Sequence, residues 1–166
     1  MEEFRIRQGR VLRAMILAAA LTAVVLTGAA LWPPEPRPLE ARLDLVLGAD
    51  LVLVSWLALA IGNIARLRLL SPDAIDGGET PGSPVDRAQA VLRNTLEQVV
   101  LAVPVHLALA VRRPDALPLI LALVGLFSLG RILFLRGHAR GAEARALGFG
   151  LTFYPTVAAA VLAAVA

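Results

Sequence analysis

Five long apolar runs divide this chain, and they restrict its fold more than any other feature of the sequence. Each run is close to the roughly 20 residues that a helix needs to cross the hydrocarbon core of a bilayer. Lipid offers no hydrogen bonds to the backbone, so such segments must pair their own N–H and C=O groups as helices. The runs cover residues 14–32, 43–70, 85–111, 117–136 and 146–166. They predict an all-α integral membrane protein.

The composition supports this class and excludes others. The chain has 166 residues, of which 58% are hydrophobic and only 17% charged, and this is too apolar for a soluble domain. All 16 basic residues are arginine. They are scattered and have no interleaved aromatic residues, so we expect no nucleic-acid partner. The absence of cysteine excludes disulfides, a protein thiolate and a cysteine metal site, and we expect no metal.

The first apolar run has two interpretations. It follows a start with four arginines, as a secretory signal peptide would. The run is long for a signal peptide, however, and no small-x-small cleavage site follows Trp32, so we favour a retained transmembrane helix. The next segment prevents helix continuation, because it contains Pro33, Pro34, Pro36 and Pro38. We therefore predict an N-terminal transmembrane helix with a proline-rich connector, residues 1–42, and a four-helix domain, residues 43–166.

Most polar residues near the ends of the later spans have a structural explanation. Asp44 and Asp50 near the start of the second span complement a helix N-terminus, and Arg66 and Arg68 complement its C-terminus. His106 lies deep in the third span, where a hydrogen-bonded structural histidine is the favoured interpretation.

The sequence also predicts the type of connection between the later spans. Residues 71–84 are rich in helix breakers and predict a polar surface loop, and residues 112–115 predict a tight connection. Residues 136–145 predict a polar, glycine-containing turn. Gly148 and Gly150 in the fifth span are expected to let helices pack closely.

The distribution of arginine predicts the orientation in the membrane. Cytoplasmic loops carry an excess of arginine and lysine. With the N-terminus inside, 12 of the 16 arginines lie on the cytoplasmic side. These are Arg5, Arg7, Arg10, Arg13, Arg66, Arg68, Arg87, Arg93, Arg131, Arg136, Arg140 and Arg145. We therefore expect a multi-pass protein of the cell membrane with a cytoplasmic N-terminus.

A polar stripe at the start of the third span is the strongest indication of a functional site. At 100° per residue, Asn94 and Glu97 share one helix face, and Arg93 lies within i,i+4 reach of Glu97. Ionisable groups in an apolar span are costly, which makes them candidates for function. The alternative is an interhelical clamp in which Arg93 or a neighbour's arginine pairs with them. Several arginines at the same membrane face favour a small peptide-like anion as ligand, because arginine pairs bidentately with carboxylates.

Two motifs in this region carry a resemblance to a known family. The third span has Arg87 followed by Arg93-Asn94-Thr95-Leu96-Glu97-Gln98. The next two spans have Arg131-x-x-Phe134-x-x-Gly137-His138-x-x-Gly141-x-x-x-Arg145-x-x-Gly148. From about residue 43 to the C-terminus, the chain resembles a divergent bacterial member of the MAPEG family, the membrane-associated proteins in eicosanoid and glutathione metabolism. Its first helix would be an addition to that fold.

The resemblance implies a four-helix transmembrane bundle that forms a homotrimer and binds glutathione between subunits. The absence of lysine and the abundance of alanine, leucine and valine indicate a bacterium, so we expect the bacterial inner membrane. By carry-over, Asn94 and Glu97 would hold the backbone and ammonium group of glutathione. Arg145 would be catalytic, because a nearby cation favours the reactive thiolate. The expected glutathione-binding residues are Arg66, Arg68, Arg87, Arg93, Asn94, Glu97, Arg131 and His138.

Two functions remain open. The leading hypothesis is a transferase or peroxidase that uses glutathione, or a related thiol, on lipophilic electrophiles from the lipid bilayer. The rival is a non-catalytic protein of the same fold that binds a small anion or a protein partner; a small transporter is less favoured, because no internal repeat is evident. The departures from the pattern of active members are Ala90, Gln98, Phe134 and His138. Of these, Ala90, Phe134 and His138 favour the rival, whereas the intact Asn94, Glu97 and Arg145 favour the enzyme. For His138 a solvated loop position is the favoured interpretation.

Overall fold

All five apolar runs form helices in the computed structural model, which describes residues 1–32, 35–78 and 80–166. The helices are α1 (Glu2–Leu31), α2 (Leu39–Leu69), α3 (Pro84–Arg112), α4 (Leu117–His138) and α5 (Ala142–Val165). Each is long and apolar enough to cross a membrane. The predicted all-α membrane architecture is therefore confirmed. Pro33 and Pro34 of the predicted connector lie outside the described residues.

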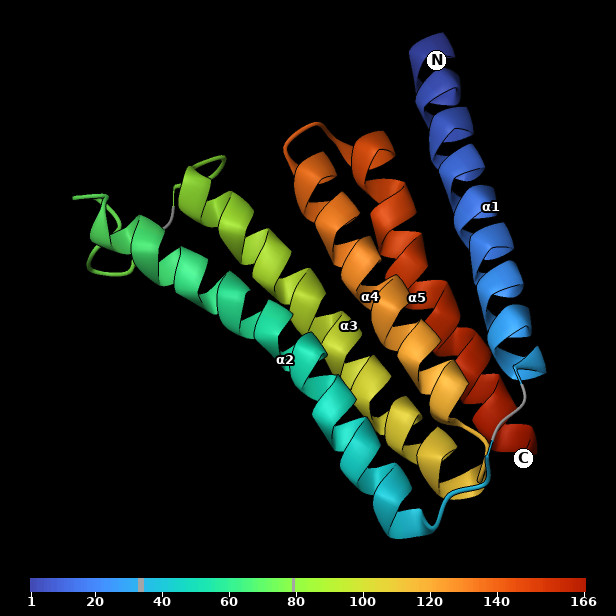
Figure 1. The fold of residues 1–166 in the computed structure, drawn as a ribbon. Coiled ribbons are helices and arrows are strands. Elements are labelled where there is room, and N and C mark those ends of the chain that lie inside the picture. The colour runs from blue at the N-terminus through green and yellow to red at the C-terminus, as the bar shows by residue number, and fades with distance from the viewer. Residues whose placement is uncertain (33–34, 79) are drawn as a thin grey trace.

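The helices form an up-and-down bundle. α2 packs mainly on α3, α4 packs on α5, and α1 packs against the other side of α5 (Figure 1). The N-terminus and the α2–α3 and α4–α5 loops lie at one end of the bundle, whereas the C-terminus and the α3–α4 loop lie at the other (Figure 1). This order brings the start of α3, the end of α4 and the start of α5 to the same end.

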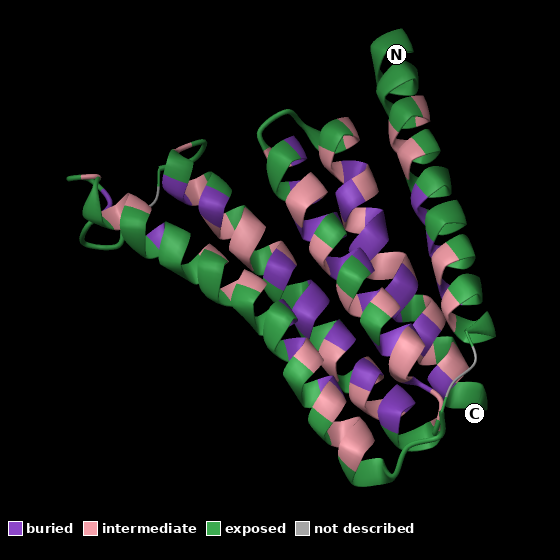
Figure 2. Cartoon of the chain, viewed as in Figure 1, coloured by how far each residue is buried: buried purple, intermediate pink, exposed green. Residues whose placement is uncertain are grey.

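Burial is uneven among the helices. α4 and α5 carry much of the buried surface, whereas α1 and α2 are largely exposed along their length (Figure 2). The exposed residues of these two helices are often large and apolar, such as Val24, 71% exposed, and Leu51, 64% exposed. In water such a surface would be unusual for a monomer. It is the surface that a bilayer would cover.

Glycines set the close contacts of α5. A methyl group on Gly130 of α4 would lie 2.7 Å from the Thr152 side chain and 2.8 Å from the Gly148 carbonyl of α5. A methyl group on Gly150 would lie 2.6 Å from the side chain of Ala18 in α1. The expected packing role of Gly148 and Gly150 is therefore confirmed, and Gly150 determines how closely α1 approaches.

A buried polar pair ties α2 to α3. The Nδ1 atom of His106 lies 2.6 Å from Oδ1 of Asp50, and both side chains are almost fully buried. The structural role predicted for His106 is confirmed. The helix-start interpretation of Asp50 is wrong, because α2 begins at Leu39 and so places Asp50 well inside the helix.

The predicted turn over residues 136–145 is also wrong in extent. α4 continues to His138 and α5 begins at Ala142, so only residues 139–141 connect them. The break occurs at Gly141, whose φ of +103° is a conformation that other residues rarely adopt. His138 is therefore the last residue of a helix, and the solvated-loop interpretation is wrong.

At the end of the bundle that holds the α3–α4 connection, two arginine side chains form stabilising hydrogen bonds. The tight α3–α4 connection is present as predicted. Arg113 Nε and Nη2 donate to the two carboxylate oxygens of Asp115 at 3.1 and 2.8 Å. These hydrogen bonds lower the pKa of Asp115 and raise the pKa of Arg113. Arg42 of α2 adds a hydrogen bond from Nη1 to the Ala110 carbonyl at 2.7 Å.

Candidate functional site

The start of α3 is fixed by a well-defined cap. Ser83 accepts a hydrogen bond from the Asp86 N–H at 3.1 Å, and Pro84 occupies the first turn, as the helix-start preferences predict. The Asp86 carboxylate accepts from the Gly82 N–H at 2.8 Å, and Arg87 donates to the Gly82 carbonyl at 2.9 Å. Arg87 is thus part of the capping loop.

A cavity of about 430 Å³ lies beside this stripe. Its walls come from α1, α3, α4 and α5, and one part is polar while the rest is apolar. The polar side chains are Arg93, Asn94, Glu97, His138 and Arg145. The apolar side chains are Val11, Met15, Ala90, Phe134, Ala142, Ala146 and Phe149. Five of the nine residues predicted for the site therefore line one cavity.

The catalytic candidate Arg145 has a defined partner. Its Nη1 atom lies 3.3 Å from Nδ1 of His138. A guanidinium has hydrogen-bond donors only, so His138 must accept through Nδ1 and carry its proton on Nε2. Arg145 is in this way held by a neutral imidazole against the cavity wall. No carboxylate of the described residues pairs with it, and its charge is available to a ligand.

Arg131 lies behind the cavity wall and not in it. Its side chain is about 1% exposed. Nη1 and Nη2 both donate to Asn94 Oδ1 at 3.0 Å, and Nη1 also donates to Thr95 at 3.2 Å. The guanidinium carbon is 4.4 Å from the centre of the Phe134 ring, within the range of a cation–π contact.

These contacts give Asn94 a fixed orientation. Because its carbonyl oxygen is occupied by Arg131, the amide nitrogen is the group left to donate to a ligand. The interhelical clamp predicted for the third span exists, but its cation is Arg131 of the same chain and its partner is Asn94. Arg93 and Glu97 are exposed and form no ion pair within the described part of the chain. Both remain available to a ligand.

The remaining predicted residues lie away from the cavity. Arg66 donates to Asn63 of its own helix at 3.1 Å, and among the described lining residues none comes from α2. Arg68 is likewise in the last turn of α2. These positions leave the predicted ligand contacts of Arg66 and Arg68 as predictions, since a single chain does not bring them to the cavity.

Sequence reasoning missed the apolar wall. Val11 and Met15 of α1 line the cavity beside Phe149 of α5. Val11 and Met15 are separated from the polar motifs by more than 70 residues of sequence, and no motif links them. The small residues Ala18 and Gly150, which allow α1 to approach α5, were the signal that could have indicated this contact.

Comparison with known families matches residues 45–165 to the MAPEG family. The matched segment begins within α2 and reaches the end of α5, so it contains α3, α4 and α5 and excludes α1. Comparisons with curated proteins and with solved structures gave no match.

Proposed function

Because the chain belongs to the MAPEG family, we propose that it is a membrane-bound transferase or peroxidase that uses glutathione, or a related thiol, on lipophilic electrophiles. The thiol would bind in the cavity beside α3. We place this cavity at the cytoplasmic face of the cell membrane of a bacterium. The protein would act as a homotrimer.

One observation carries the proposal. Two arginines, a carboxylate, an oriented amide and a histidine line the same cavity as a group of apolar side chains. Arg93 suits a ligand carboxylate, and Glu97 suits an ammonium group. Asn94, with its oxygen held by Arg131, would donate to a peptide carbonyl. A tripeptide thiol offers all three kinds of group.

Arg145 would favour the thiolate of the bound ligand. The thiolate is the nucleophilic form, and a nearby cation lowers the pKa of a thiol. In a transfer reaction, the thiol proton passes to water and the sulfur lone pair forms a bond to the electrophilic carbon. The electron pair displaced from that carbon then leaves with a group or takes up a proton. His138 would position Arg145 through the 3.3 Å contact.

The alternative is a non-catalytic protein of the same fold that binds a small anion or a protein partner. Ala90 and Phe134 support it, because both line the cavity and neither has a hydrogen-bonding side chain. Such a protein would keep the polar cluster but would not stabilise a thiolate.

The proposal is tested by thermal unfolding of the detergent-purified protein with and without millimolar glutathione. A ligand at about 100 times its dissociation constant stabilises the folded state by about 2.7 kcal/mol. We expect the wild type to be stabilised, and we expect Glu97→Ala and Arg145→Ala to lose most of this effect.

Arg136→Ala is the matched control, because Arg136 is an exposed arginine at the same end of α4 that does not line the cavity. It should respond to glutathione as the wild type does. If neither glutathione nor other cellular thiols stabilise the wild type, the thiol site is wrong. If stabilisation occurs without turnover of electrophiles or hydroperoxides, the non-catalytic alternative holds.

A further inference from the structure

The helix that lies outside the family match forms part of the candidate site. α1 precedes the matched residues 45–165, yet its Val11 and Met15 line the cavity. Both are apolar, and they line the same cavity as Phe149 of α5. The polar groups all come from α3, α4 and α5. The cavity is therefore divided by chemistry, and α1 contributes only to its apolar part.

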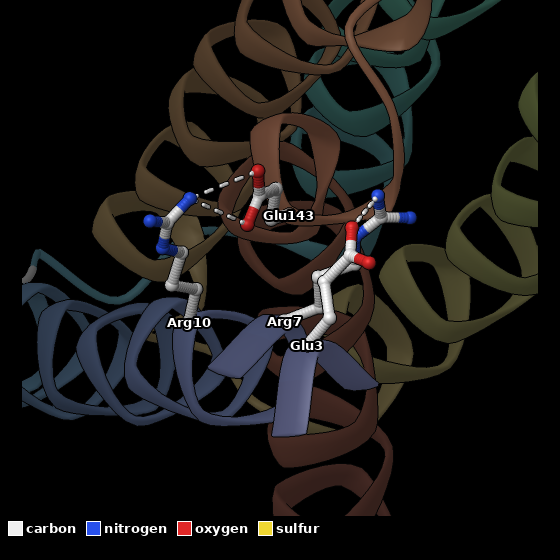
Figure 3. A network of polar contacts seen from close by, with 4 residues as sticks. All are labelled: Glu3, Arg7, Arg10 and Glu143. Carbon is white, nitrogen blue, oxygen red and sulfur yellow. Dashed lines mark hydrogen bonds and ion pairs between the residues drawn. The ribbon is translucent and has the colours of Figure 1, made fainter. Parts of the chain in front are cut away.

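Two contacts hold α1 in this position. Ala18 is fully buried, and its side chain meets the place where any side chain on Gly150 would be. One residue before Val11, Arg10 Nη1 lies 3.3 Å from both carboxylate oxygens of Glu143 in α5. Figure 3 shows Arg10 reaching from α1 to Glu143, whereas the neighbouring Arg7–Glu3 pair lies within α1. Contacts on both sides of Val11 and Met15 thus fix the register of α1 against α5.

We propose that α1 forms the wall of a subsite for the alkyl chain of the lipophilic co-substrate, with Met15 and Val11 setting the length of chain that fits. This inference rests on the proposed thiol site. A thiol held by Arg93, Asn94 and Glu97 leaves the apolar residues of the same cavity for its reaction partner. Methionine suits such a wall, because its flexible thioether adapts to chains of different shape. The occupant is an electrophile that bears an alkyl chain. Its reaction product with the thiol is a thioether, which holds the alkyl chain and the peptide part of the thiol in one molecule.

The chain has no cysteine, so a single introduced cysteine reports on this wall without background. The test measures the rate at which a membrane-permeant maleimide labels Met15→Cys in the purified full-length protein. The ligands are S-decylglutathione and S-methylglutathione, two thioethers that do not react with maleimide. At about ten times its dissociation constant a ligand leaves roughly a tenth of the sites free, so labelling should slow about tenfold with S-decylglutathione. S-methylglutathione should slow it much less.

Ile16→Cys is the matched control, because Ile16 is adjacent in α1 but 60% exposed and not part of the cavity lining. Its labelling should not respond to either ligand. Val11→Cys gives a second reporter if Met15→Cys does not fold, and it should be protected in the same way.

Three results would overturn the inference. If both thioethers raise the unfolding temperature of the wild type but neither protects the introduced cysteine, the alkyl subsite is wrong and the thiol site stands. If S-methylglutathione and S-decylglutathione protect the introduced cysteine equally, the alkyl subsite is also wrong and the thiol site stands. If neither compound raises the unfolding temperature, the thiol site and the alkyl subsite are both wrong.

Discussion

At the scale of single residues, the candidate site depends on side chains that orient other side chains. Arg131 holds the Asn94 carbonyl, and His138 holds Arg145. In the first pair only Asn94 lines the cavity, whereas in the second both residues line it, and in each pair one side chain limits the rotation of the other. The burial of Arg131 without a carboxylate partner among the described residues is costly, and its contacts with Asn94, Thr95 and Phe134 offset that cost.

His138→Phe tests whether the histidine positions Arg145. Phenylalanine has a similar shape but no acceptor, so Arg145 would lose its partner. Hydrogen bonds to charged groups contribute about 1.5–3 kcal/mol, and 1.4 kcal/mol is about tenfold in affinity. We therefore expect the dissociation constant for glutathione, measured by calorimetry, to rise about tenfold. His138→Gln offers an amide oxygen as acceptor and should recover much of the loss; equal weakening by both variants would contradict a positioning role.

At the scale of helices, the α4–α5 contact places His138 and Arg145 together. Both lie close to the connection, whose three residues, 139–141, leave little freedom between the two helices. Gly148 lies one turn beyond Arg145, against the backbone of α4. The glycines of the second sequence motif are therefore explained by packing and by the backbone at Gly141, without a direct role in ligand binding.

Gly148→Ala should open this contact. The added methyl group would lie 2.6 Å from the Gly130 carbonyl oxygen and 2.7 Å from Phe134 Cα, and backbone atoms cannot rotate away. Overpacking of this kind typically costs about 1–3 kcal/mol, so the unfolding temperature in detergent should fall.

Gly125→Ala is the control for the Gly148 experiment. It lies on the same helix as Gly130, and a methyl group there would meet nothing within 4 Å. Alanine in a helix is favoured over glycine by roughly 0.5–1 kcal/mol, so this variant should unfold at the same or a higher temperature. A similar loss of stability in both variants would show that close packing at Gly148 is not the cause.

The sequence predicts these helices well but their partners poorly. Apolar length alone predicts that each span exists, and arginine placement predicts which ends lie together. The alternation of polar residues could not reveal that Asn94 meets Arg131, because the two lie 37 residues apart and several arginines were equally available. Residues 136–145 were predicted as a turn because they are polar, whereas polar residues at a membrane surface can equally continue a helix. Asp50 was misassigned because the start of α2 was placed four residues too late.

At the scale of the whole molecule, the chain combines a four-helix unit with one further helix that completes its cavity. The exposed apolar faces of α1 and α2 (Figure 2) are suited to lipid or to neighbouring subunits. Arg66 and Arg68 lie at the end of α2, away from the cavity of their own chain. If the protein forms the predicted homotrimer, Arg66 and Arg68 would contact a ligand that is bound in the cavity of a neighbouring subunit.

The Asp50–His106 pair has a consequence for biogenesis. The two residues are 56 positions apart, so at a synthesis rate of about 5–20 residues per second His106 follows Asp50 by roughly 3–11 s. If α2 entered the membrane during that interval, it would carry an unpartnered aspartate, which costs about 2.5–3.5 kcal/mol near a helix centre. We expect Asp50→Leu to raise the membrane insertion of α2 strongly in chains truncated before α3, and only slightly in the full chain. An equal gain in both would mean that α2 inserts without waiting for its partner; the expected difference would make the α2–α3 hairpin the unit of insertion.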